Sequence, residues 1–247
     1  EKKLKKIIKK NEDLKANREQ VTNVHFYGAG CGTEKPKALL KEVLEEIFLN
    51  AVVEVKEDTM AAVYATISNK TEAAVVCIMG TGSNCSYYDG EKLHQRVKSL
   101  GYSIMDDAAG NYYGRQLIRD YYFNHMPEDV KIAFETKFNV EDDYIKYNLY
   151  KQPNPNAYLA NFAEFMFLHK DSEYTLNLIK DGIRLFAKNM IMQYEEEIKT
   201  VPVHFAGSIA YFSQDQIREV ANEMGFTVGN FERRPIEGLV AFHTTKK

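Results

Sequence analysis

The sequence predicts an α/β protein with a mainly parallel sheet. Strand-like and helix-like segments alternate from residue 21 to residue 67, and turns containing glycine follow several of the apolar runs. The chain has 247 residues, of which 45% are hydrophobic, so it can bury the cores of two modest domains.

The first predicted element is a charged amphipathic helix over residues 1–20, with Leu4, Ile7 and Ile8 on one apolar stripe. Basic residues crowd its start, which leaves a membrane or nucleic-acid contact open, but the stripe is short and acidic residues follow. A solvated helix is therefore the favoured interpretation. The next elements are a strand over 21–30, a helix from Pro36, a strand over 52–58 and a helix over 59–67.

A short polar stretch at 68–72 is interpreted as the link to a second unit. There the apolar run 71–79 predicts a strand, and 93–105 is a further strand candidate. Residues 111–123 and most of 127–200 have a helical pattern, which is broken once, by Pro153 and Pro155. The remaining predictions are a strand over 202–206, a helix over 213–225 with Ser213 as N-cap and Gly225 after its end, a strand over 226–234 and a helix from Pro235.

Charge and composition exclude several classes of protein. A net charge of −3 and a pI near 6.1 give no electrostatic signature of a nucleic-acid binder. The longest apolar runs are far too short to cross a bilayer, and no secretory signal is visible. Cys31, Cys77 and Cys85 lack metal-ligand spacing, which predicts reduced, structural thiols in a cytoplasmic protein.

The turn Gly80-Thr81-Gly82-Ser83 follows the strand at 71–79 and precedes a second short strand. Glycines let backbone N–H groups approach an anion, and the two hydroxyls add donors, so the turn is a candidate phosphate loop. An ordinary hairpin turn has the same composition. The spacing fits neither a P-loop nor a GxGxxG helix start, so any nucleotide site must combine several loops.

Other candidate residues follow strands, where α/β sheets commonly bind ligands. Asp58 is either the N-cap of a helix or a general base. Asp106 and Asp107 are adjacent, so in an extended chain only one of them faces a given pocket. The turn at Gly207-Ser208 lies between a strand and a helix, where it either admits a nucleoside or allows close packing.

In order along the chain, these motifs resemble the N-acetylglucosamine kinase group. They are GAGC at 28–31, ED at 57–58, GTGSNC at 80–85, an acidic pair at 106–107, AGSIA at 206–210 and PIEGL at 235–239. That group belongs to the BadF/BadG/BcrA/BcrD ATPase family of the actin, hexokinase and Hsp70 superfamily. The resemblance extends from about Val21 to His243.

The resemblance implies two ribonuclease-H-like, actin-like ATPase domains around a central cleft. Residues 1–70 would form a partial N-terminal domain, and residues 71–247 a C-terminal domain with a helical insertion. Family members begin with a strand and a DGGGTKT-type phosphate turn. The printed sequence contains no such segment, so the first domain is expected to lack its N-terminal strands in this chain.

The resemblance also implies roles for individual residues. Asp58 would be the catalytic base. The substrate-binding residues would be Gly30, Thr59, Asn84, Gly101, Tyr102 and Asp106. The nucleotide-binding residues would be Gly80, Thr81, Gly82, Ser83, Gly207 and Ser208. The sequence departs from the family where MDDAAG at 105–110 replaces GDEGSG, which places the sugar preference in question.

Three functions follow as hypotheses. The favoured one is an ATP- and Mg²⁺-dependent kinase that phosphorylates the 6-hydroxyl of N-acetylglucosamine or glucosamine, in the cytoplasm and with a homodimer as a possible assembly. No nucleic-acid or membrane partner is expected. The alternatives are a sugar or nucleotide sensor without catalysis, and an ATPase that activates a dehydratase through an iron–sulfur cluster.

Overall fold

A computed structural model describes residues 6–8, 10–28 and 30–244. The chain divides into two compact units, Glu1–Ala61 and Ala62–Lys247. Leu4, one of the three residues of the predicted apolar stripe, lies outside the described residues. Each unit is described by itself below.

The first unit is built on two parallel strands. The helices α2 (Glu12–Asn17) and η1 (Arg18–Gln20) precede β1 (Asn23–Gly28), and α3 (Glu34–Ile47) connects β1 to β2 (Val52–Glu57). Leu44 and Phe48 at the end of α3 pack with Val53 of β2 into a small buried core. The predicted strand, helix and strand are therefore confirmed, and α4 (Asp58–Thr66) follows β2 directly.

The second unit contains a five-stranded mixed sheet with the order β5-β4-β3-β6-β7. Its strands are β3 (Ala74–Met79), β4 (Ser83–Tyr88), β5 (Leu93–His94), β6 (Val203–Ala206) and β7 (Val228–Glu232). β3 and β4 form the predicted antiparallel hairpin, whereas β3, β6 and β7 run parallel. The glycine-containing turns after β3 and β6 consequently lie at the same edge of the sheet.

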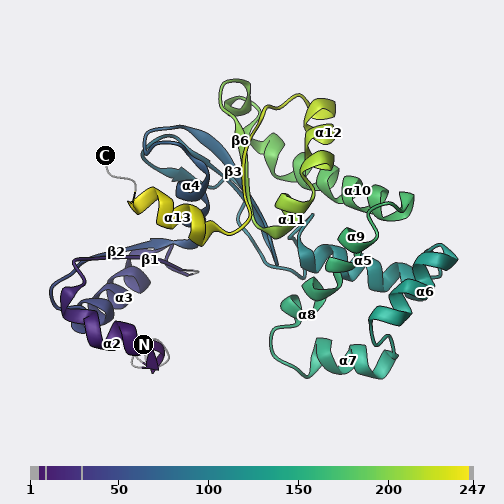
Figure 1. The fold of residues 1–247 in the computed structure, drawn as a ribbon. Coiled ribbons are helices and arrows are strands. Elements are labelled where there is room, and N and C mark those ends of the chain that lie inside the picture. The colour runs from purple at the N-terminus through teal and green to yellow at the C-terminus, as the bar shows by residue number, and fades with distance from the viewer. Residues whose placement is uncertain (1–5, 9, 29, 245–247) are drawn as a thin grey trace. The chain divides into compact units, whose positions relative to one another are not determined.

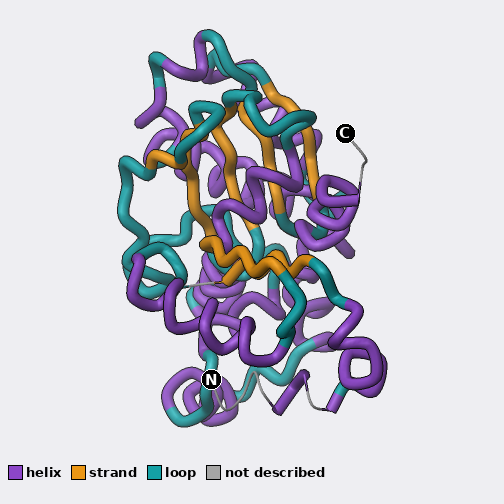
Figure 2. The backbone as a smooth tube through the Cα atoms, turned by 90° about the vertical axis from the view of Figure 1, so that its left-hand side faces the viewer, coloured by secondary structure: helices purple, strands orange, loops and turns teal. Residues whose placement is uncertain are grey.

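Helices cover both faces of this sheet. α4 and α13 (Pro235–Thr244) lie on one face, and α10 (Glu173–Asn189) and α12 (Gln214–Met224) on the other (Figure 1). Tyr64 of α4 stacks on Phe242 of α13, with ring centroids 4.6 Å apart. Figure 2, seen from the α4 side, shows the strands of this sheet side by side. The mixed α/β class predicted from the sequence is confirmed.

The helical insertion extends from α5 (Gly110–Tyr122) to α10. Between them lie α6 (Glu128–Lys137), α7 (Asp142–Tyr150), α8 (Pro155–Phe162) and α9 (Glu164–Leu168), and two short 3-10 turns follow α10. The helical prediction for 127–200 is confirmed, but the helical structure is interrupted more than once. At Phe138 the backbone becomes extended, and the ring packs 5.0 Å from Phe134 and 4.6 Å from Phe162.

The predicted strand over 93–105 is wrong beyond His94. The Arg96 N–H donates to the hydroxyl of Tyr194 at 3.0 Å, and the Arg96 guanidinium pairs with Glu197. Because these contacts hold Arg96 to the segment after α10, the chain leaves the sheet. Gly101, with φ of 83°, then turns it toward Asp106.

At the ends of α12, one cap is confirmed and the other is not. Gly225 adopts the left-handed conformation, with φ of 80°, and its N–H donates to the Ala221 carbonyl. Ser213 stands at the N-cap position, but its side chain makes no capping bond, and its buried hydroxyl has no hydrogen-bond partner among the described residues.

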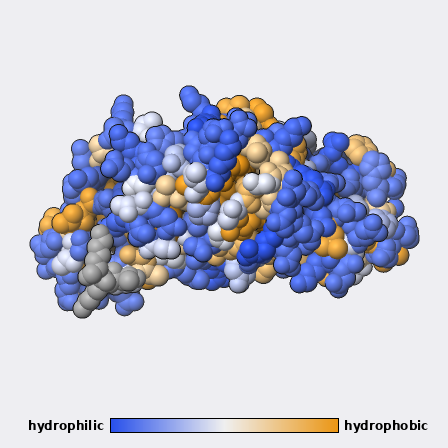
Figure 3. Space-filling model, turned by 90° about the horizontal axis from the view of Figure 1, so that it is seen from above, coloured by the Kyte–Doolittle hydropathy of each residue, from blue (hydrophilic) through white to orange (hydrophobic). Residues whose placement is uncertain are grey.

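The surface is mixed. Figure 3 shows a face on which hydrophilic residues predominate and apolar ones emerge in small groups. None of the described helices combines the length and the apolarity needed to span a bilayer.

His204 of β6 makes the free energy of unfolding depend on pH. Its side chain is buried, its Nδ1 accepts the Asn230 N–H at 2.7 Å, and burial lowers its pKa. As pH falls below the unfolded value of about 6.5, the unfolded chain takes up a proton before the folded chain does, so stability falls until the lowered folded pKa is reached. We expect His204→Gln, which keeps an acceptor, to show a smaller loss of Tm between pH 7 and pH 5.5 than the wild type.

The matched control for this prediction is His125→Gln, at a largely exposed histidine. It should keep the wild-type dependence of Tm on pH. An unchanged dependence in His204→Gln would show that His204 does not cause it.

Candidate functional site

In the first unit, the predicted site residues meet at the carboxyl edge of the two strands. Gly28 of β1 pairs with Glu57 of β2, so the turn that contains Gly30 and the start of α4 at Asp58 both follow this pair. Gly30 is exposed, and its φ of 80° is a conformation that glycine adopts without steric cost. The parallel register therefore brings two of the predicted residues to one edge.

The structure supports the helix-cap interpretation of Asp58 and does not test its role as a general base. It is the first residue of α4, and its Oδ1 accepts the N–H of Thr59 at 3.1 Å, which caps the helix. The residue is also exposed, so its carboxylate remains accessible to a substrate. Beside it, the Thr59 hydroxyl is enclosed and has no hydrogen-bond partner among the described residues.

In the second unit, the turn between β3 and β4 is docked on the start of α5. The carbonyls of Gly80 and Thr81 accept the N–H groups of Gly110 and Asn111 at 2.8 and 3.1 Å. In a planar trans peptide the N–H points opposite to the carbonyl. The N–H groups of Thr81 and Gly82 are therefore directed away from α5, as an anion-binding loop requires.

The turn at Gly207 packs directly on this loop. A Cβ at Gly207 would lie 2.5 Å from the Met79 carbonyl oxygen and 3.1 Å from the Gly80 nitrogen. Gly207 also has φ of 110°, and α11 (Ser208–Phe212) begins immediately after it. The structure thus brings together the two segments that the sequence predicted as nucleotide-binding, although 124 residues of sequence lie between Ser83 and Ser208.

The acidic pair, Asp106 and Asp107, also contacts this loop. A Cβ at Gly82 would lie 2.8 Å from Oδ2 of Asp106, so this carboxylate touches the loop backbone. Asn111 donates to the same oxygen at 2.9 Å, and Ser83 Oγ donates to the Asp107 carbonyl at 2.8 Å. The candidate phosphate loop and the acidic segment therefore form one hydrogen-bonded unit.

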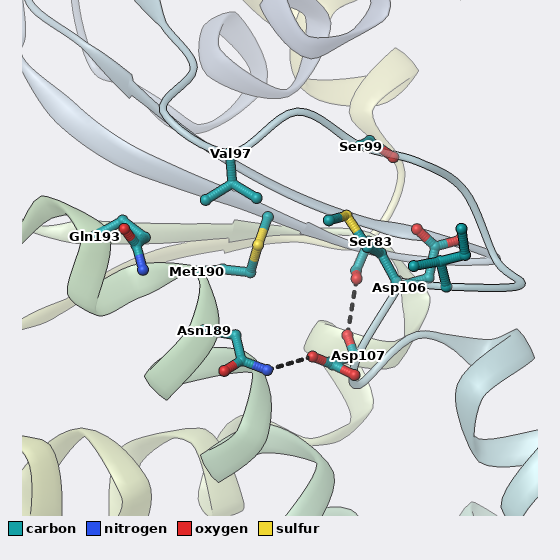
Figure 4. A pocket seen from close by; sticks show the side chains of 10 residues that line it. Ser83, Val97, Ser99, Asp106, Asp107, Asn189, Met190 and Gln193 are labelled. Atoms are coloured by element: carbon teal, nitrogen blue, oxygen red, sulfur yellow. Dashed lines mark hydrogen bonds between the residues drawn. The ribbon is translucent and has the colours of Figure 1, made fainter.

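The expectation that only one of Asp106 and Asp107 faces a given pocket is wrong. Both line a cavity of about 350 Å³, together with Ser83 and Met190. The expectation assumed an extended chain, but Asp106 has φ of 68°, which turns the backbone and brings both residues to the same cavity. Figure 4 shows Asp107 between Ser83 and Asn189, whose amide donates to its carboxylate at 2.9 Å.

A second cavity, of about 520 Å³, begins at Ser208. Phe167 and Phe212 line it, with ring centroids 5.5 Å apart, together with Ile209 and Asn161. Its size and its mainly apolar walls with a few polar groups are typical of small-molecule sites. Ser83 of the loop 80–83 therefore lines the cavity of Asp106 and Asp107. The Gly207 turn, which packs on the loop, is followed directly by Ser208, which lines the second cavity.

The remaining predicted residues are placed as follows. Asn84 follows the loop in β4, and its Oδ1 accepts from the Cys85 N–H at 2.7 Å and from Gln95 at 2.8 Å. The Gly101 carbonyl accepts the Met105 N–H and so shapes the segment that leads to Asp106. Tyr102 does not line the cavity of Asp106 and Asp107 but a third one, of about 390 Å³.

Sequence reasoning missed Asn111, Asn189 and Phe212. Asn111 is 2% exposed at the start of α5, and its Oδ1 has no hydrogen-bond partner among the described residues. A buried amide in the first turn of a helix, five residues after Asp106, is a signal that the sequence does contain. Asn189 comes from a distant segment, whereas Phe212 ends α11, four residues after Ser208. Nothing in the local sequence marks either residue.

The three cysteines are free and buried, as predicted. Cys77 and Cys85 pair across β3 and β4 with their sulfurs 3.5 Å apart, and burial raises the pKa of the Cys77 thiol well above its usual value. This thiol is therefore protonated at neutral pH, which suits a core residue better than a metal ligand. Among the described residues, no group of three or more histidine, cysteine or acidic side chains could hold a metal ion.

Comparison with solved structures reveals a similar protein over nearly the whole chain. It is the "Putative N-acetylglucosamine Kinase" of Porphyromonas gingivalis, which is 30% identical, with a TM-score of 0.84, over 94% of this chain and 82% of that one. No protein-family model matches the sequence, and no curated protein matches it either.

Two more distant structures share the fold. One is the "Putative N-acetylglucosamine Kinase" of Chromobacterium violaceum, with 12% identity, a TM-score of 0.61 and coverage of 77% of this chain and 65% of that one. The other is a "putative N-acetylmannosamine kinase" of Listeria monocytogenes, with 14% identity, a TM-score of 0.52 and coverage of 96% and 85%. On the strength of the Porphyromonas match, the chain belongs to the N-acetylglucosamine kinase-like family of proteins with the actin-like ATPase fold.

Proposed function

We propose that the protein is an ATP-dependent kinase that phosphorylates the 6-hydroxyl of an amino sugar, N-acetylglucosamine or glucosamine. One observation carries the proposal: Gly207 packs on Gly80 while Asp106 touches Gly82, so the turn before Ser208 and the acidic segment meet on one loop, and Ser208 and Asp106 each line a cavity. A phosphoryl-transfer enzyme needs this arrangement, because the phosphate must pass from a nucleotide on one side to an acceptor on the other. The similarity to the Porphyromonas protein supports the choice of an amino sugar.

On the nucleotide side, the cavity at Ser208 would take the adenine and ribose. Phe167 and Phe212 offer aromatic faces for a base, and Ser208 offers a hydroxyl at the first turn of α11. The phosphates would then lie along Gly80-Thr81-Gly82-Ser83, where the N–H groups of Thr81 and Gly82 face away from α5. Fixed backbone dipoles stabilise the developing charge without reorganising during the reaction.

Magnesium fits this loop as an ion that enters with the nucleotide. In kinases Mg²⁺ is held largely by phosphates and water and needs few protein oxygens, so the described residues need no dedicated cluster of ligands. The hydroxyl of Thr81, at the exposed tip of the loop, would supply one such oxygen. When bound, the ion neutralises part of the phosphate charge.

On the sugar side, Asp58 would act as the general base. An accessible carboxylate that is fixed at a helix start can accept the proton of an attacking hydroxyl. Gly30 and Thr59 come from the same sheet edge as Asp58. Asn84 and Asp106 are the further proposed sugar-binding residues. Gly101 would act by shaping the segment that carries Asp106.

The direct test uses the full-length protein with ATP, Mg²⁺ and a panel of N-acetylglucosamine, glucosamine, N-acetylmannosamine and glucose. We expect ADP release that depends on an amino sugar, and a product whose phosphate is on O6 by NMR. The 6-deoxy analogue should bind without turnover. ADP release that no sugar stimulates would contradict the proposal, and saturable sugar binding without a phosphorylated product would identify a sensor instead.

Asp106→Asn tests the sugar side separately. The amide can still accept the bond from Asn111, but it loses the charge that would hold a sugar hydroxyl. A hydrogen bond to a charged group contributes about 1.5–3 kcal/mol, so we expect the sugar KM to rise about tenfold or more while the Kd for ATP stays near the wild-type value.

The control for this variant is Asp215→Asn, in the first turn of α12. It should leave both constants unchanged. A loss of ATP affinity in Asp106→Asn with an unchanged sugar KM would assign Asp106 to the nucleotide instead.

A further inference from the structure

The cavity of about 390 Å³ is separate from the cavity at Asp106 and Asp107 and from the cavity at Ser208. It lies between α5, the end of α7 and the start of α8, and it shares no lining residue with either of the other cavities. Leu149 and Leu159 contribute apolar walls, and Tyr102 and Tyr150 contribute aromatic rings. Its volume is within the range of small-molecule sites.

Two arginines line this cavity. Arg115 and Arg119 are four residues apart on α5, so they project from the same face of the helix. Neither of them forms an ion pair with any carboxylate in the described part of the chain. Other described arginines do pair, for example Arg96 with Glu197, Arg184 with Glu223 and Arg234 with Glu237.

Both arginines lie beside aromatic rings. The guanidinium carbon of Arg115 is 5.9 Å from the ring centroid of Tyr112, and that of Arg119 is 5.2 Å from the ring centroid of Phe123. A cation–π contact of this kind uses the charge of the guanidinium and none of its N–H donors. Arg115 donates one N–H to the Tyr102 carbonyl, at 3.3 Å.

The residues that line the cavity favour the binding of an anion. None of the aspartates and glutamates that the structure describes lines it, although the protein as a whole has a net charge of −3. Two guanidiniums one helical turn apart match the oxygens of a phosphate group, which they bind by paired hydrogen bonds. The leucines and the tyrosines suit an organic ring attached to that phosphate.

We propose that this cavity is a binding site for a small organic phosphate, with Arg115 and Arg119 on the phosphoryl group and Tyr150 against the ring. The ligand is a phosphomonoester, either a sugar phosphate or a nucleoside monophosphate. The inference rests on the arginines and the cavity alone, and it holds whether or not the chain phosphorylates an amino sugar.

The absence of tryptophan from the sequence allows a local test. Tyr150 is 77% exposed at the cavity, so Tyr150→Trp gives the full-length protein a single tryptophan there. Its fluorescence is titrated without ATP, using N-acetylglucosamine 6-phosphate, AMP, inorganic phosphate and unphosphorylated N-acetylglucosamine. We expect saturable binding of one of the two organic phosphates, at least about tenfold tighter than inorganic phosphate.

Arginine variants in the Tyr150→Trp background test whether the ligand binds at this cavity. Arg119→Met keeps the apolar stem and should weaken binding about tenfold or more, whereas Arg218→Met, at an exposed arginine that stacks on Phe231, should not change it. Tm measurements confirm that each variant is folded. The proposal is overturned if neither organic phosphate binds, if inorganic phosphate binds equally well, or if the two arginine variants have the same affinity.

Discussion

Asp58→Asn is expected to lower kcat for sugar phosphorylation by about 10²–10⁴, the usual contribution of a general base. The amide oxygen can still accept the Thr59 N–H, so the start of α4 keeps its cap, but the side chain no longer accepts a proton at neutral pH. Sugar-dependent ADP release measures the loss. The Kd for ATP should stay near the wild-type value, because the proposed nucleotide residues belong to other segments.

Asp142→Asn is the matched control for this variant. Asp142 is also the first residue of a helix, and its Oδ1 accepts the N–H of the following residue at 2.8 Å. It therefore reports what removing a carboxylate that accepts an N–H at a helix start does by itself, and kcat should be unchanged. If Asp58→Asn kept kcat within a factor of two of the wild type, Asp58 would be only a helix cap.

The local elements of the fold were predictable because each has a local physical cause. β1 and β2 follow from short runs rich in β-branched and aromatic residues, α3 follows from helical spacing of its apolar residues, and the β3–β4 hairpin follows from the Gly80–Ser83 turn after an apolar run. The left-handed end of α12 follows from Gly225, since glycine adopts that conformation without strain. In these segments the residues that form the element also determine it.

The segment from 95 to 109 could not be predicted, because distant residues determine it. Arg96 leaves the sheet to contact Tyr194 and Glu197, about a hundred positions further along the chain. Asp106 adopts a positive φ, which is uncommon outside glycine although aspartate tolerates it better than most residues, and the hydrogen bond from the Asn111 amide holds its side chain. Neither the contacts of Arg96 nor the hydrogen bond from Asn111 to Asp106 can be read from a local sequence pattern.

The same distinction applies to the candidate site. The glycine turns at 80–83 and 207 were identifiable because close backbone approach needs glycine, and the structure places them in contact. Of the side chains that hold Asp106 and Asp107, Asn111 had a local signal as an amide at a helix start, whereas Asn189 was not identifiable, because it lies at the end of a helix 82 residues after Asp107. The roles of Asp58 and the sugar-side residues remain predictions that the variants test.

Gly207→Ala is expected to weaken ATP binding by about a hundredfold. Two costs combine, because φ of 110° is a conformation that residues other than glycine rarely adopt, and the new Cβ would lie 2.5 Å from the Met79 carbonyl oxygen. The three nearest atoms at this point, the Met79 carbonyl oxygen and carbon and the Gly80 nitrogen, are all backbone, so the Ser208 turn must move away from the phosphate loop. A nucleotide that spans both segments then loses its fit to one of them, which costs about 1.4 kcal/mol for each factor of ten.

Gly225→Ala separates the two costs. Gly225 also has positive φ, at 80°, but beyond its own helix and chain neighbours no atom of a described residue lies within 4 Å of the position of its Cβ, so this variant carries only the backbone strain of about 1–2 kcal/mol. Its Tm should fall, and its Kd for ATP should match that of the wild type. In Gly207→Ala the Tm should fall further, because the collision adds to the strain. Equal ATP affinity in the two variants would mean that the contact between Gly207 and Gly80 does not position the nucleotide, and that the 207–208 turn is only a packing element of the sheet edge.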